Sequence, residues 1–208
     1  MKSLLRTLTG LILIAVSVSA QTEKPIVLPR PQTDGGKPLM QVLKERQSGR
    51  EFSSEKLPPQ LLSNLLWAAW GVNRPDGRRT APSASNRQEI DIYVATPEGL
   101  YLYNATDHQL QPLVKEDLRA ATGRQPYVGQ AALNLIYVAD QTRMGRPDDS
   151  TAFADTGFIS QNVYLFCASE GLATVVRGSV DRESLSKLMK LRPDQKITLA
   201  QTVGYPKK

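Results

Sequence analysis

Residues 58–71 read PPQLLSNLLWAAWG and predict a helix that is apolar on nearly every side. Two prolines are tolerated in a first helical turn, and the glycine falls just past the helix end. A second run, residues 158–171, has the same apolar character. Helices of this kind must be buried on all sides, which a small domain hardly achieves alone. We therefore expect a large dimer interface; the alternative is two central helices wrapped by the rest of one chain.

Strand-like runs surround these two helices. Residues 90–95 and 100–103 predict a hairpin, and residues 133–139, 172–177 and 197–203 predict three further strands. Short helices are expected at residues 38–46 and near residues 181–191, the latter capped by Asp181. Because the order lacks a regular alternation of strand and helix, the predicted fold class is α+β.

The composition removes several classes of chemistry. The chain has 208 residues, 26 Lys+Arg against 20 Asp+Glu, and 40% hydrophobic residues, which suits one ordinary domain. Its single cysteine, Cys167, cannot form an internal disulfide, and we expect it to be buried. With His108 as the only histidine, no Cys- or His-based metal site and no Cys-His catalytic pair is expected.

The N-terminus has the pattern of an export signal. Lys2 and Arg6 precede an apolar stretch at residues 8–18, and small residues end at Ala20. We expect residues 1–20 to be a Sec-type signal peptide cut after Ala20, giving a periplasmic or secreted protein; a retained membrane anchor is the alternative. Removing Lys2 and Arg6 lowers the net charge from +6 to +4. Residues 21–37 then form a linker or a loosely attached N-terminal arm.

Three separated segments combine cationic, hydroxyl and glycine residues where the chain should turn. They are residues 46–50 (RQSGR), 78–88 (RRTAPSASNRQ) and 177–179 (RGS). Guanidinium groups, hydroxyls and free backbone amides together suit a phosphate joined to a planar, hydrogen-bonding ring. Taken singly, each segment is weak evidence, because a basic loop is more often a solvated surface.

The order of these segments resembles the flavin-dependent nitroreductase superfamily, and most closely its thiazole- and oxazole-forming peptide dehydrogenase (SagB-type) branch. The resemblance covers residues 38–208, and it rests on ordered motifs: LLWAAWG at 65–71, RRTAPSA at 78–84, GLYLY at 99–103, DTG at 155–157 with QN at 161–162, and VGYP at 203–206. It implies a central mixed or antiparallel sheet flanked by helices, in an intertwined homodimer with FMN bound between the subunits.

The resemblance also implies roles for individual residues. It places Arg46, Gln47 and Ser48 at the FMN phosphate, and Arg50 beside the pyrimidine edge of the ring. It places Pro82, Ser83 and Asn86 against the isoalloxazine. Gly178, with Arg177, matches the turn whose amide approaches the hydride-accepting nitrogen. Lys207 and Lys208 fall where a C-terminal basic phosphate contact is common.

The function that follows is an exported FMN oxidoreductase. It would transfer hydride by a ping-pong cycle from an electron donor, with NAD(P)H as one candidate, to a small oxidised acceptor such as a nitroaromatic or a quinone. No protein nucleophile, metal or nucleic-acid partner is needed, and no stable membrane insertion is expected after signal cleavage. The alternatives are a noncatalytic FMN-binding or flavin-scavenging protein and an unliganded basic interaction domain that has lost the cofactor.

Overall fold

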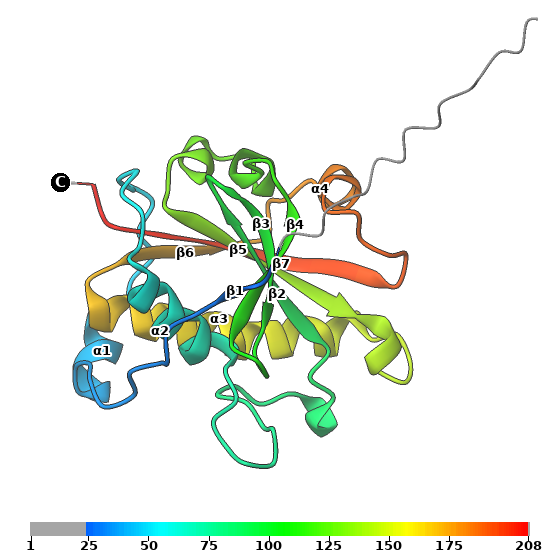
Figure 1. Cartoon of the computed structure of the whole chain (residues 1–208), viewed down its shortest axis with the longest axis horizontal. Coiled ribbons are helices and arrows are strands. Elements are labelled where there is room, and N and C mark those ends of the chain that lie inside the picture. Colours follow the sequence, from blue (N-terminus) through cyan, green and yellow to red (C-terminus); the bar gives the residue numbers. More distant parts are fainter. Residues whose placement is uncertain (1–23, 208) are drawn as a thin grey trace, which may run out of the picture.

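A seven-stranded sheet organises the chain, and every strand in it pairs with its neighbours antiparallel (Figure 1). The computed structural model describes residues 24–207, so the predicted signal peptide and Lys208 lie outside it. The strands follow one another across the sheet in this order: β1 (Ile26–Val27), β4 (Gln109–Val114), β3 (Gly99–Asn104), β2 (Ile90–Thr96), β5 (Leu133–Asp140), β7 (Gln195–Gly204) and β6 (Ala173–Arg177). The predicted α+β class is confirmed, and the sheet is antiparallel.

Helices cover both faces of the sheet. Helices α2 (Pro59–Trp70) and α3 (Asp149–Glu170) pack on one face, where Leu66 and Ile159 are fully buried against the sheet. Helix α4 (Arg182–Leu188) and the segment 115–131 lie on the other face (Figure 1). Helix α1 (Leu39–Glu45) packs beside α3 at its C-terminal end. Within residues 24–207 no helix is long and apolar enough to cross a membrane.

The predicted helices and strands are present, with two differences. Helix α3 begins nine residues before the expected start at residue 158, because Asp148 caps it by accepting a bond from Thr151 N–H. The first turns of α3 are more polar than residues 158–171 and therefore lack the apolar pattern that predicts a helix there. Strands β1 and β4 were not predicted, since β1 has two residues and β4 contains Pro112 together with two glutamines.

Neither central helix is sealed on all sides within one chain. Phe153 and Phe158 on α3 are 41% and 49% exposed, and Leu61, Leu62 and Trp67 on α2 are only half-buried. Their outer faces are available to a second copy. The dimer interface therefore stays a prediction, and Cys167 is buried as expected.

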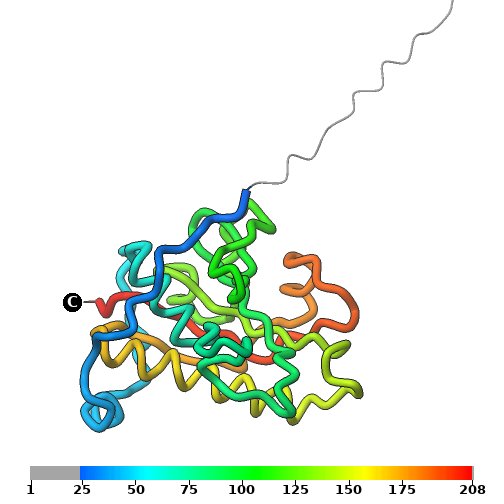
Figure 2. Tube along the Cα trace, turned by 60° about the horizontal axis from the view of Figure 1, so that its bottom comes forward, coloured from blue at the N-terminus to red at the C-terminus, as the bar shows by residue number. Residues whose placement is uncertain are grey.

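The N-terminal arm is attached rather than loose, which corrects the prediction for residues 24–37. Figure 2 shows this stretch running down one side of the molecule to α1. Its strand β1 pairs with β4, and Pro29 O accepts a 2.5 Å bond from Ser63 Oγ. His108, between strands, lies 2.7 Å from the same Ser63 hydroxyl, so it supports this attachment. The arm ends at Lys37, whose N–H donates to Ser169 Oγ at 3.0 Å.

Candidate functional site

A cationic cavity of about 890 Å³ opens where α1, the end of α3 and the start of β6 meet. Five basic side chains line it: Lys37, Lys44, Arg46, Arg50 and Lys207. The acids in the lining are Glu45 and Glu51, and Lys37 pairs with Glu45 at 2.7 Å. Arg50 and Lys207 make no side-chain ion pair within the described chain, so their charges are free to meet an anion.

The loop after α1 is fixed to the sheet by its glycine. Gly49 N–H donates to Thr174 O at 3.0 Å, and a Cβ at Gly49 would lie only 3.0 Å from Ala173 Cβ. Any larger residue would push the loop away from β6. Gly49 therefore sets the depth at which Ser48 and Arg50 enter the cavity wall.

Tyr164 holds the same loop from the side of α3. Its hydroxyl lies 2.9 Å from Ser48 Oγ and accepts a bond from Val176 N–H at 3.0 Å. The Arg46 guanidinium stacks 5.3 Å from the centre of the Tyr164 ring, within the range of a cation–π contact. One buried phenol thus positions Arg46, Ser48 and strand β6 together.

Replacing Tyr164 with Phe should lower the free energy of unfolding by about 1–3 kcal/mol, because Val176 N–H and Ser48 lose their common partner. Denaturant unfolding measures this change. Tyr205→Phe is a control, since Tyr205 is half-buried on the last segment and makes no side-chain hydrogen bond within residues 24–207. Equal losses in the two variants would contradict the assigned role of Tyr164.

A second hollow of about 460 Å³ adjoins the first and shares Arg50, Glu51 and Lys207 with it. Its remaining lining includes two aromatic rings, those of Phe52 and Tyr127, whose centres are 5.5 Å apart. The two hollows therefore offer a cationic compartment followed by an aromatic one. Arg50 and Lys207 stand where they meet.

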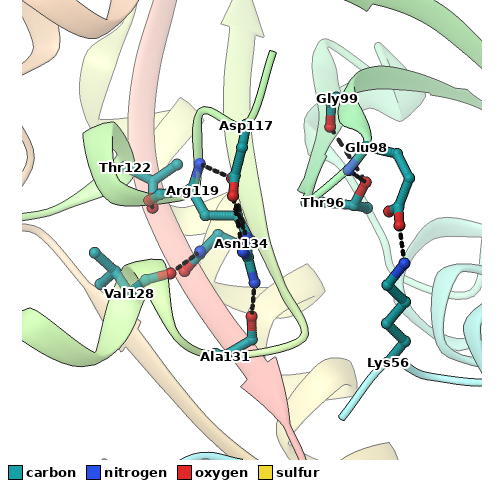
Figure 3. Close-up of polar contacts among 10 residues, drawn as sticks. All are labelled: Lys56, Thr96, Glu98, Gly99, Asp117, Arg119, Thr122, Val128, Ala131 and Asn134. Atoms are coloured by element: carbon teal, nitrogen blue, oxygen red, sulfur yellow. Dashed lines mark hydrogen bonds and ion pairs between the residues drawn. The ribbon is translucent and has the colours of Figure 1, made fainter. Parts of the chain in front are cut away.

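The segment that carries Tyr127 is pinned to the sheet by polar contacts (Figure 3). Arg119 pairs with Asp117 at 2.7 Å and donates to Ala131 O at 2.6 Å. Asn134, on β5, donates to Val128 O at 2.7 Å. These bonds close the segment at both ends and hold Tyr127 where it packs against Phe52.

The Arg177 side chain does not reach either hollow. It is 5% exposed and donates to Thr122 O at 2.8 Å, to Asn134 Oδ1 at 2.9 Å and to Thr202 Oγ1 at 3.1 Å. Burial lowers the pKa of Arg177 to about 10. Its guanidinium thus ties segment 119–129 to the sheet, and at the turn Gly178 and Ser179 remain exposed.

The 82–88 loop lies at the other end of α3 from the cavity. Ala84 N–H donates to Asp155 Oδ2 at 2.8 Å, whereas the cavity is lined by Tyr164 and Cys167. Nine residues of helix separate Asp155 from Tyr164, which is about 14 Å along the axis. Pro82 and Asn86 are exposed and Ser83 is half-buried. One chain therefore does not bring this loop into the cationic cavity.

Of the predicted site residues, the cavity brings together Arg46, Gln47, Ser48, Arg50 and Lys207. The 82–88 loop and the 177–179 turn lie outside its lining, and Lys208 is beyond the described residues. Sequence reasoning missed Lys37, Lys44, Phe52, Tyr127 and Tyr164. Lys37 precedes the predicted helix at 38–46 and Lys44 lies within it, and both could have been proposed from charge alone. The aromatic residues come from distant segments and carry no local pattern.

Fold and site define a known class. The nitroreductase family model matches residues 43–205, and the chain belongs to the nitroreductase family. A Methanocaldococcus jannaschii protein described as a nitroreductase is 32% identical over 168 residues, covering 74% of this chain and 85% of that protein. A Ralstonia eutropha protein of known crystal structure, also described as a nitroreductase, is 44% identical to this chain. The two structures superpose with a TM-score of 0.85, and the match covers 91% of this chain and 93% of that protein's chain.

A Desulfovibrio desulfuricans protein, described as a nitroreductase and crystallised in complex with FMN, shares the fold. It is 19% identical, with a TM-score of 0.63 over 84% of this chain and 89% of its own. At that identity the likeness establishes the fold alone.

Proposed function

We propose that this protein is an FMN-dependent oxidoreductase. The observation that carries the proposal is the pair of adjoining hollows, one cationic and one aromatic, with Arg50 and Lys207 where they meet. These residues fit a phosphate joined to a planar ring: cations without ion-pair partners, a loop that approaches β6 at Gly49, and two aromatic side chains. When bound, FMN would supply the hydride-accepting and hydride-donating chemistry.

The chain's own residues would bind and orient that group. Arg46, Ser48 and Lys207 would hold the phosphate, with Lys37 and Lys44 adding positive charge at the rim. Arg50 stands between the hollows, where a fixed positive charge favours the reduced ring because negative charge develops there. Phe52 and Tyr127 would line the ring's compartment and restrict water.

We propose that the site is completed by a second copy of the chain. The 82–88 loop lies about 14 Å along α3 from the cationic cavity, so Pro82, Ser83 and Asn86 would reach a flavin held in the partner subunit. The half-exposed faces of α2 and α3 supply apolar surface for such an interface. Gly178 would offer its amide to the ring from the end of β6.

The remaining parts of the proposal rest on the sequence. Ping-pong transfer from a donor such as NAD(P)H to a nitroaromatic or quinone is what the resemblance of the ordered motifs implies. The thiazole- and oxazole-forming branch is proposed on the same resemblance. Export to the periplasm or medium rests on residues 1–20. An exported enzyme would meet little NAD(P)H, so quinols are tested as donors beside it.

The visible spectrum of the purified protein tests the function. A flavin spectrum, retained or restored by added FMN, is the expected result. Under anaerobic conditions, NADH or NADPH should then bleach this spectrum. If NADH, NADPH and dithionite-reduced quinols all fail to bleach it, the noncatalytic flavin-binding alternative is favoured. An absence of flavin that added FMN does not restore would leave the basic interaction domain.

Arg50→Ala should weaken FMN binding by about 1.5–3 kcal/mol, the size of a charge-assisted contact. Fluorescence titration of the flavin-free protein measures it. Arg146→Ala is the matched control, because Arg146 is exposed and lines neither hollow. An unchanged dissociation constant in Arg50→Ala would refute the role of Arg50.

A further inference from the structure

The 83–88 loop is held in a strained conformation. Ser85, Asn86 and Gln88 have φ angles of 54°, 52° and 51°, in the left-handed region that non-glycine residues rarely adopt. Such residues cost free energy and persist only where surrounding contacts impose them. The imposing contact from α3 is the 2.8 Å bond from Ala84 N–H to Asp155 Oδ2.

A second carboxyl group is buried beside this contact. Glu89, the residue that follows the loop, is 0% exposed, and neither of its carboxyl oxygens has a hydrogen-bond partner when both acids are ionised. Asp155 is 3% exposed and is the side chain with which Glu89 can form a hydrogen bond. Two ionised carboxylates would face each other there, and neither could donate a hydrogen bond to the other. A single proton shared between the two acids would supply the donor for a hydrogen bond between them.

The cation that faces the pair, Arg143, favours the ionised form of Glu89 less than burial disfavours it. The charged group facing Glu89 from the end of β5 is Arg143, which is already bonded to Asp91 at 2.5 Å and to Gln88 O at 2.8 Å. From α3 the facing group is Asp155, which is itself acidic. The backbone of Glu89 is fixed by Asp140 N–H, which donates to Glu89 O at 2.9 Å, so the residue cannot move away without local opening.

We propose that Glu89 and Asp155 share one proton as a buried acid pair, and that this pair is a pH-sensitive clamp on the strained 83–88 loop. With the proton in place, Asp155 is oriented to hold Ala84. Without it, two like charges occupy one buried site, and hydrating Glu89 requires the adjoining loop to open. Consistent with this arrangement, burial together with Asp155 raises the pKa of Glu89 to about 7.

The consequence for cofactor binding rests on the proposed function, whereas the clamp itself does not. If the loop contacts a flavin in the partner subunit, opening it near neutral pH would weaken that contact. Glu89 and Asp155 are positioning residues in this scheme, since they act through the loop and touch no reacting atom.

Hydrogen exchange of the full-length protein tests the clamp directly. The protection factor of the Ala84 amide, corrected for intrinsic exchange, should fall about tenfold or more between pH 5.5 and pH 8.5 as the shared proton is lost. In Glu89→Gln, whose amide donates to Asp155 at every pH, it should change less than about twofold. Glu183→Gln, at an exposed acid on α4, is the matched control and should behave as the wild type.

A flat wild-type profile, or equal profiles in wild type and Glu89→Gln, would overturn the proposal. Should Glu89→Gln fail to fold, Asp155→Asn tests the same point, because its amide can donate to Glu89 while its oxygen still accepts from Ala84. Infrared spectra give an independent readout: the wild type at pH 5.5 should show a protonated carboxyl band that Glu89→Gln lacks. Absence of that band in the wild type would also refute the shared proton.

Flavin titration at the two pH values separates this inference from the proposed function. Weaker FMN binding at pH 8.5 in the wild type, abolished in Glu89→Gln, is expected. A protein that binds no FMN, yet shows the exchange behaviour above, would refute the proposed function and leave the clamp intact. FMN affinity that follows pH identically in both proteins would refute the link from clamp to cofactor.

Discussion

Replacing Arg177 with methionine is expected to lower the free energy of unfolding by about 2–4 kcal/mol. The guanidinium is the common partner of Thr122 O, Asn134 Oδ1 and Thr202 Oγ1, and methionine satisfies none of them. Relief of the buried charge offsets part of this loss, because burial already lowers the pKa of Arg177 to about 10. The lost bonds outweigh that relief, since a buried carbonyl left without a donor costs more than a bond exchanged with water.

Urea unfolding of Arg177→Met measures the effect, and Arg124→Met is the control. Arg124 is exposed on the same segment, so its replacement should change stability by less than about 0.5 kcal/mol. Because Arg177 ties segment 119–129 to the sheet, protease should also cut that segment faster in Arg177→Met. Stability equal to the control would mean that desolvation of the guanidinium cancels its hydrogen bonds, and that Arg177 does not anchor the segment.

The wild-type protein should lose up to about 3 kcal/mol of stability between pH 5 and pH 8 through Glu89. The pKa of this buried acid is raised from 4.5 to about 7 in the folded state, so the folded protein holds a proton that the unfolded chain releases. That contribution is fully present below pH 4.5 and is lost as the pH rises through 7. Burial also raises the pKa of Asp91, which acts in the same direction.

Thermal or urea unfolding across this pH range measures the slope, and Glu89→Gln should remove most of it. The acids whose pKa is lowered, among them Asp140 and Asp181, contribute their stability above about pH 4, so they do not mask the effect in this window. A wild type that is equally stable at pH 5 and pH 8 would contradict the raised pKa of Glu89.

Much of the fold could be predicted from local patterns. The apolar run at 58–71 and the strand-like runs at 90–95 and 133–139 correspond to α2, β2 and β5. The errors occur where the local pattern is weak: the polar first turns of α3, the proline-containing β4 and the two-residue β1. In each, a cap or a long-range pairing stabilises the element, and neither is encoded in hydrophobic periodicity.

The candidate site was only partly predictable for the same reason. Arg46, Ser48 and Arg50 lie within five residues of one another and form a recognisable motif, and all three line the cavity. Arg177 resembles them in sequence, yet its side chain turns into the interior, because partners for its donors come from residues 122, 134 and 202. The Glu89–Asp155 pair joins residues 66 positions apart, so no local pattern could have indicated it.

The two margins of the sheet restrict how copies of this chain can associate. One margin is the two-residue β1, preceded by Pro25 and followed within two residues by Pro29, which cannot donate to another strand. At the other, two backbone groups of β6 are occupied from outside the sheet: Thr174 O by Gly49 and Val176 N–H by Tyr164. A further strand at either margin would therefore meet few free hydrogen-bonding groups, which opposes edge-to-edge aggregation.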